Sequence, residues 1–238
     1  AFMASAFVVF GLTCAGLVGA GYWYRGNATE KRTVCVEVVQ GDRAFIRPAY
    51  QRNWSALPAR GSAPGCTSGT PILLGELDAL QTRNGTQVLL NFWDGSVVQV
   101  FEGTEIQLTE LRTTQYISQA SFVTIRQARG LIRVALAPGN YSRSRYQVLG
   151  GDTTVLMKEG DGHTGEGSFI VQVTPRDAEA DDAAVTVRAS VQRGVGAVRV
   201  AGRAEELRLG ANEQTIVPPG GPPGVPTRAR RDLVANGR

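Results

Sequence analysis

The chain has 238 residues, a net charge of +4 and a sequence pI near 9.2. Its 25 basic residues are scattered among 21 acidic ones, and no dense basic run with interleaved aromatic residues occurs before the last dozen positions, which disfavours nucleic-acid binding. His163 is the only histidine, which excludes a metal site with several histidines and weakens any proposal of a histidine-based catalytic triad.

Residues 1–25 are predicted to form a transmembrane helix. Residues 1–24 contain no charged side chain, and a helix of that length spans about 36 Å, enough for a hydrocarbon core of about 30 Å. The run ends in membrane-interface anchors that suit the level of the lipid headgroups, namely Tyr22, Trp23, Tyr24 and Arg25. A cleaved signal peptide is the competing interpretation.

A stripe of small residues lies on one face of this predicted helix. Gly11, Ala15 and Gly19 are four residues apart, so they are expected to let another membrane helix approach closely. The alternative is that glycine and alanine are simply common in spanning helices.

Residues 26–71 are predicted to contain a strand at 33–39 and an extended loop at 51–71 that proline and glycine keep irregular. Cys35 and Cys66 flank this polar stretch. In an oxidising compartment they would form a disulfide worth about 3–4 kcal/mol in the chain-entropy model. Two unrelated thiols are the alternative.

Residues 72–217 show a series of short strands with scarcely any helical periodicity. The clearest hairpin joins 87–92 to 96–101 through the turn dipeptide Asp94-Gly95. Further strands are expected at 106–111, 123–126, 131–136, 146–149, 153–157, 168–173, 185–191, 197–200, 206–209 and 213–217. The predicted fold class is all-β, an antiparallel β-sandwich or barrel behind one transmembrane helix.

Residues 218–238 are rich in proline and glycine and end in a basic stretch, so an extended, solvated tail is predicted. The alternative is docking onto an acidic partner surface or onto anionic lipid headgroups. No phosphate-binding or dinucleotide-binding motif follows a strand. Asp161 and Glu166, beside His163, match no known calcium loop. We therefore predict a protein without catalytic, cofactor-binding or metal-ligating residues.

Five stretches together resemble the FecR-domain family. Leu74–Thr82 is similar to the family's entry motif, 87–96 to its hairpin with a D-G-S turn, and 103–106 to its continuation. Arg129–Val134 and 207–214 resemble two later motifs. The sequence departs from the family at 165–171, which only approximates its middle strand, and at Asn212, which replaces a glycine.

The resemblance implies an extracytoplasmic β domain behind a single helix in the bacterial plasma (inner) membrane. The disulfide agrees with this orientation, whereas Arg25, Lys31 and Arg32 favour a cytoplasmic side by the positive-inside rule. The best-known family members relay a signal from an outer-membrane receptor to a sigma factor through an N-terminal cytoplasmic segment, whereas many others resemble envelope proteins without an assigned partner. The 238 residues do not include that segment, so the sigma-factor role is not carried over.

Two functions are expected from these observations. The first is a non-catalytic, FecR-like protein-interaction or sensory module that binds an envelope protein or ligand. The second is a structural accessory subunit of a larger respiratory or photosynthetic membrane complex. In either, the partners are other membrane helices or subunits and the lipid bilayer. A third, weaker interpretation is binding of cell-wall carbohydrate through Trp54 or Trp93.

Overall fold

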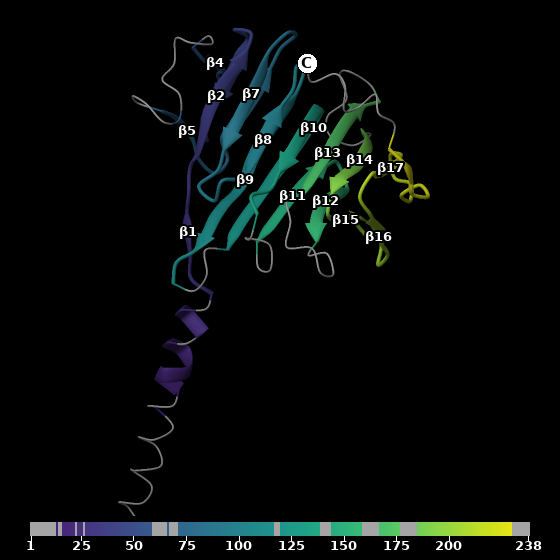
Figure 1. The fold of residues 1–238 in the computed structure, drawn as a ribbon. Coiled ribbons are helices and arrows are strands. Elements are labelled where there is room, and N and C mark those ends of the chain that lie inside the picture. The colour runs from purple at the N-terminus through teal and green to yellow at the C-terminus, as the bar shows by residue number, and fades with distance from the viewer. Residues whose placement is uncertain are drawn as a thin grey trace, which may run out of the picture.

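The computed structural model describes residues 13, 16–21, 23–25, 27–58, 66, 71–116, 120–138, 144–158, 167–176 and 185–229. Helical residues occur at 13, 16–21, 23–25 and 27, and they project from a body made of strands (Figure 1). The strands are β1 (Thr29–Lys31), β2 (Val34–Gln40), β3 (Ala44–Arg47), β4 (Ser55–Ala56), β5 (Ile72–Leu74), β6 (Ala79–Thr82), β7 (Gln87–Asn91), β8 (Val97–Val100), β9 (Glu105–Thr114), β10 (Ser121–Ala135), β11 (Arg145–Gly150), β12 (Thr153–Lys158), β13 (Ser168–Pro175), β14 (Val185–Arg193), β15 (Val195–Val200), β16 (Glu206–Leu209), β17 (Glu213–Val217) and β18 (Thr227–Arg228).

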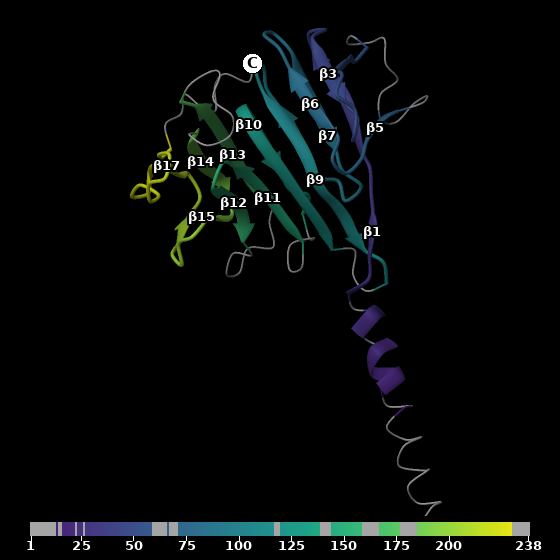
Figure 2. The same cartoon turned by 180° about the vertical axis from the view of Figure 1, so that it is seen from behind.

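The strands form two sheets that share the long strand β10. In sheet A the order is β4-β3-β6-β9-β10-β11-β12-β15-β16, and β1 pairs with the far end of β9 on the same edge as β6. In sheet B the order is β5-β2-β7-β8-β10-β13-β14-β17-β18. The two sheets curve around one core (Figures 1 and 2), so the all-β fold class is confirmed.

The core follows from the alternation of apolar and polar residues along each strand. In β7 the side chains of Val88 and Leu90 are buried while their neighbours are half-exposed, and β8 repeats the pattern with Val98 and Val100. Successive side chains of a strand point to opposite faces, so this alternation gives each sheet one apolar inner face. Burial of these inner faces is the main favourable contribution to folding.

The strand β10 passes from sheet A to sheet B at a sharp corner around Gly130. Residues 121–129 pair with β9, and residues 132–135 pair with β8. Gly130 has a φ of +91°, and a Cβ atom there would lie 2.4 Å from the Cα of Thr104. Only glycine fits this corner, because both the backbone angle and the contact exclude a side chain.

Thr104 fixes the corner through hydrogen bonds to β10 and to β6. Its hydroxyl accepts from the Leu131 amide at 2.9 Å and lies 3.1 Å from the Leu131 carbonyl oxygen, while its own amide donates to the Thr82 hydroxyl. The amide of the Gln127 side chain, which is buried, donates to the Gly130 carbonyl at 2.8 Å. The Thr104 hydroxyl and the Gln127 side-chain amide thus find partners inside the corner, whereas the Gln127 side-chain oxygen has none.

A second connection between the sheets lies where the two ends of β10 approach each other. The Tyr146 hydroxyl, at the start of β11, donates to the Asp94 carboxylate in the β7–β8 turn. Burial, the negative charge of Asp94 and the hydrogen bond to it raise the pKa of Tyr146 far above its usual range, so the phenol remains a donor. The Phe92 ring packs edge-on against the same tyrosine.

The structure adds to the expected fold at three places. The β10–β11 pair is parallel, because the corner brings the ends of β10 near each other and Arg145 can then pair beside Phe122. Residues 26–71 form no separate segment, since β2 lies between β5 and β7. The tail is not wholly an extended linker, since β18 pairs with β17, where its backbone satisfies groups at the sheet edge.

Replacing Gly130 with alanine is expected to lower the free energy of unfolding by about 3 kcal/mol or more, since strain at positive φ adds to the clash with Thr104. Gly202 is the matched control: its φ is +75°, but a Cβ atom there meets nothing within 4 Å, so Gly202→Ala should cost only about 1 kcal/mol. Urea denaturation measures both, and equal losses would contradict the role of the corner.

Candidate interaction surfaces

The structure joins Cys35 and Cys66 in a disulfide, with Cα atoms 5.8 Å apart. Cys35 lies in β2 opposite Asn91 of β7, and the Asn91 side-chain amide donates to the sulfur of Cys66 at 3.3 Å. The bridge therefore fastens residue 66 to sheet B, next to Asn91 of β7.

Part of the predicted membrane segment lies outside the described residues, including Gly11, Ala15 and Tyr22. Gly19 is exposed and a Cβ atom there would meet nothing within 4 Å, so the helix-packing face stays a prediction. The described residues include no helix with the length and hydropathy needed to cross a membrane.

The helical segment leads into sheet A without a flexible linker. The Ala28 amide donates to the Tyr24 carbonyl in the last helical turn, and the Ala28 carbonyl accepts from the Gln115 amide. Thr29 then pairs with Thr114 as β1 begins. Helix and sheet thus share consecutive backbone hydrogen bonds.

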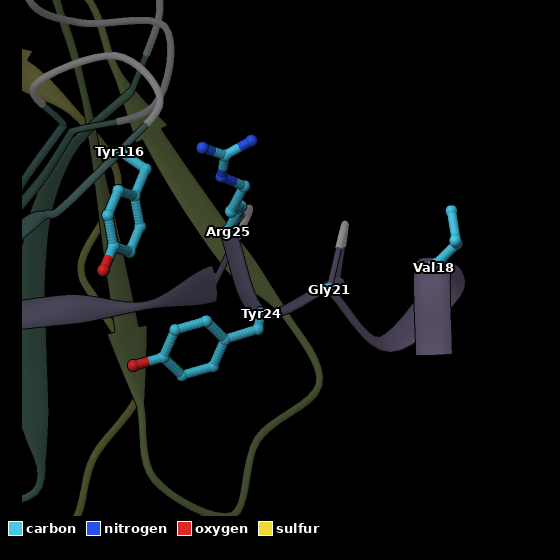
Figure 3. A pocket seen from close by; sticks show the side chains of 5 residues that line it. All are labelled: Val18, Gly21, Tyr24, Arg25 and Tyr116. Carbon is cyan, nitrogen blue, oxygen red and sulfur yellow. The ribbon is translucent and has the colours of Figure 1, made fainter. Parts of the chain in front are cut away.

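A groove of about 520 Å³ lies at this junction (Figure 3). Its lining comes from the helical segment and from the loop after β9: Val18, Gly21, Tyr24, Arg25 and Tyr116. The rings of Tyr24 and Tyr116 lie 6.3 Å apart between centroids, tilted by 49°. Sequence reasoning missed Tyr116, because it lies 92 positions after Tyr24 in the chain. The two residues become neighbours through the pairing of β1 with β9.

Glu76 holds β1 to the rest of the domain. Its carboxylate accepts from the Arg112 guanidinium at 2.8 Å and from the Leu111 amide at 3.2 Å, and lies 3.3 Å from the Lys31 ammonium. Burial opposes its ionisation, but the hydrogen bonds and the charge of Arg112 outweigh burial and hold the pKa of Glu76 below its ordinary value. The turn around Leu77, with φ of +72°, aims this carboxylate at β1 and β9.

The outward face of sheet A carries ion pairs. Arg145 contacts Glu110 at 2.9 Å, Arg129 contacts Glu105 at 3.1 Å, and Arg199 of β15 pairs with a glutamate of β16. Exposed pairs of this kind are typical of a solvated surface and contribute little to stability.

The outward face of sheet B, which we call the sheet B face, is built mainly from uncharged side chains. Three rows of directly paired residues cross it: Glu37, Leu89, Gln99, Arg133, Ile170, Ser190 and Gln214; Asn91, Val97, Ala135, Ser168 and Arg193; and Leu131, Gln172, Arg188 and Ile216. The charged members of these rows are Glu37, Arg133, Arg188 and Arg193. Ile170 is only 3% exposed although it lies outside the core cluster.

A shallow pocket of about 330 Å³ hollows one end of the sheet B face. Its polar lining comes from Arg133, Ser168, Gln192 and Arg193, and its apolar lining includes Val97 and Leu136. An arginine beside a hydroxyl and an amide can bind a carboxylate or another acceptor side chain. Sequence patterns did not single out these residues, because their proximity depends on strand register.

The remaining candidates from the sequence give no site. Trp93 packs against the core and Phe92, while the Trp54 ring faces the Arg47 guanidinium at 4.9 Å, so the two tryptophans form no common platform. His163, with Asp161 and Glu166, lies outside the described residues. Within the described residues, no group of three or more histidine, cysteine, aspartate or glutamate side chains is placed to hold a metal ion.

No family model matches the sequence, and no curated protein sequence matches it significantly. Two crystal structures are similar to it in part, both described as "a putative anti-sigma factor from Parabacteroides distasonis ATCC 8503". Their identities are 20% and 19%, their TM-scores 0.46 and 0.47, and each alignment covers 66% of this chain. The chain spans 62% and 63% of their lengths, and similarity at this level assigns no function.

Substituting Glu76 with glutamine is expected to lower the free energy of unfolding at pH 7 by about 1–2 kcal/mol, because Arg112 and Lys31 lose their shared carboxylate. Since the folded pKa lies below the ordinary value of 4.5, this stabilisation is fully present above pH 4.5 and is lost as pH falls through the folded pKa.

The control for this substitution is Glu30→Gln, which removes an exposed pair with Arg32 and should cost less than about 0.5 kcal/mol. Thermal unfolding between pH 3 and pH 8 measures both variants. An equal loss in the two, or a Glu76→Gln deficit that does not shrink in acid, would contradict the role of Glu76.

Replacing both bridged cysteines with alanine is expected to lower stability by about 3–4 kcal/mol, because the bridge closes a sequence separation of 31 residues in the unfolded chain. Reduction of the wild-type protein should lower the melting temperature comparably, and the reductant should not affect the variant. A melting temperature that is unchanged by reduction would refute the stabilising role of the bridge.

Proposed function

We propose that the chain is a membrane-anchored, extracytoplasmic module of FecR type, which binds a protein partner and catalyses no reaction. The observation that carries this proposal is the sheet B face, which combines mainly uncharged rows with one pocket that is lined by Arg133 and Arg193. Fully buried parts of protein interfaces are depleted of charged residues and retain arginine, and this face has that composition.

The pocket indicates the chemistry of the partner. Arg133 is exposed at its rim, and Ser168 with Gln192 adds donors and acceptors beside it. A partner that inserts an acidic side chain here and covers Val97, Leu131 and the adjoining glutamines would pair that charge with Arg133.

The location outside the cytoplasm is supported by the disulfide. Structural disulfides persist in oxidising compartments and are rare in the cytosol. Residues 1–24, which are uncharged, precede β1 and supply the anchor in this proposal.

Motif residues also support the FecR-type assignment, because they occupy demanding positions in the fold. Leu77 and Asn212 have positive φ, Gly130 forms the corner, and Asp94 connects the two sheets through Tyr146. The stretches that resemble FecR motifs thus contain the turn and corner residues on which the fold of the domain depends.

A photo-reactive amino acid at Gln99 tests the proposal in intact cells. We expect a discrete adduct with one partner protein, which Arg133→Glu reduces because the substitution reverses the charge at the pocket. The matched control is the same amino acid at Gln147, a half-buried glutamine on the outward face of sheet A, which should give no such adduct.

Absence of an adduct at Gln99, or equal adducts at both positions, would overturn the proposed face. Gentle detergent extraction separates the two expected roles. A stoichiometric complex that survives extraction would replace the sensory role with that of an accessory subunit, whereas a monomer would exclude that alternative.

A further inference from the structure

The groove at the helix–sheet junction has an apolar part that runs along the helical segment. Val18, Gly21 and Arg25 are spaced by three and four residues, so they share one face of the helix. A Cβ atom at Gly21 would meet nothing within 4 Å, so the missing side chain keeps this face open. The open face has the shape that a linear hydrocarbon chain needs.

The other end of the groove is polar. Tyr24 and Tyr116 are 57% and 51% exposed, and Arg25 borders the groove beside them (Figure 3). In the described part of the chain, Arg25 makes no ion pair, and neither tyrosine hydroxyl has a hydrogen-bond partner. These three residues line the same end of the groove, and arginine and tyrosine together suit a phosphate at a membrane surface.

The surrounding charge favours an anion. Glu30 pairs with Arg32, and Glu76 pairs with Lys31 and Arg112, which lies near Glu110 as well. Within the described residues, Arg25 is left without an ion pair. The C-terminal end of a helix repels anions, but the groove lies beside the last turns of the helix rather than beyond its end, and Arg25 lies there. Arg25 thus places a positive charge at the groove itself.

We infer that this groove binds an anionic phospholipid, with the headgroup phosphate between Arg25, Tyr24 and Tyr116 and one acyl chain along Val18 and Gly21. The inference depends on the membrane anchor of the proposed function and adds a specific lipid site to it. Since Tyr116 belongs to the loop after β9, the bound lipid would fix the β domain against the bilayer surface.

Trp23, which neighbours the groove in sequence and is 70% exposed, reports on bound lipid. The full chain is reconstituted in vesicles of phosphatidylcholine and phosphatidylglycerol, with bromine on the acyl chains of one lipid at a time. We expect brominated phosphatidylglycerol to quench the tryptophan fluorescence more strongly. Arg25→Gln should reduce this preference about fivefold, and Tyr116→Ala should reduce it as well.

Two variants provide matched controls, and one tests the shape of the groove. Gly19→Leu adds a side chain on the opposite side of the helix, and Arg208→Gln removes an exposed cation from the far edge of sheet A; both should leave the preference unchanged. Gly21→Leu fills the groove and should weaken quenching by both lipids.

Equal quenching by the two lipids in the wild type, or an unchanged preference in Arg25→Gln, would overturn the lipid site and leave the anchor intact. Quenching by neither lipid would instead overturn the anchor, and the lipid site with it. Loss of the preference on addition of inorganic phosphate would show that the groove takes a soluble anion, which also overturns the inference.

Discussion

The corner of β10 at Gly130 is the constraint on which the rest of the fold depends. One strand serves two sheets, so the inner faces meet only if the chain turns sharply within it. Positive φ at Gly130 and the contact with Thr104 permit that turn, and the threonine hydroxyl satisfies the backbone of Leu131 where the ladder is interrupted. The turn at Gly130 therefore decides which faces of the two sheets oppose each other in the core and which faces point outward.

The same corner explains the connection at the opposite end of the two sheets. Because β10 turns back, its ends lie near the Asp94-Gly95 turn, where Tyr146 donates to Asp94 and the Ala137 amide donates to the Ser96 hydroxyl. Asp94 also accepts from the Ser96 amide, which holds the hairpin turn in place. A turn motif that is local in sequence thus fastens sheet B to β11 of sheet A.

Local signals predicted much of the fold, and non-local pairing accounts for what was missed. The hairpin at Asp94-Gly95 and the strands with apolar alternation were predictable because each carries its own pattern. Residues 29–31 were not, because Thr-Glu-Lys has no apolar pattern and becomes β1 only by pairing with β9. The parallel β10–β11 pair, Tyr116 in the groove and the rows of the sheet B face all depend on register, which one sequence does not encode locally.

The two sheets divide the surfaces of the molecule between them. Sheet A receives the helical segment through β1, and Glu76 fixes that strand with hydrogen bonds to β9, so the junction moves with the edge of sheet A. Sheet B carries the uncharged outward face and the disulfide. Both sheets contain β10, and the Tyr146–Asp94 hydrogen bond joins them a second time, so the sheet B face and the helical segment belong to one hydrogen-bonded framework.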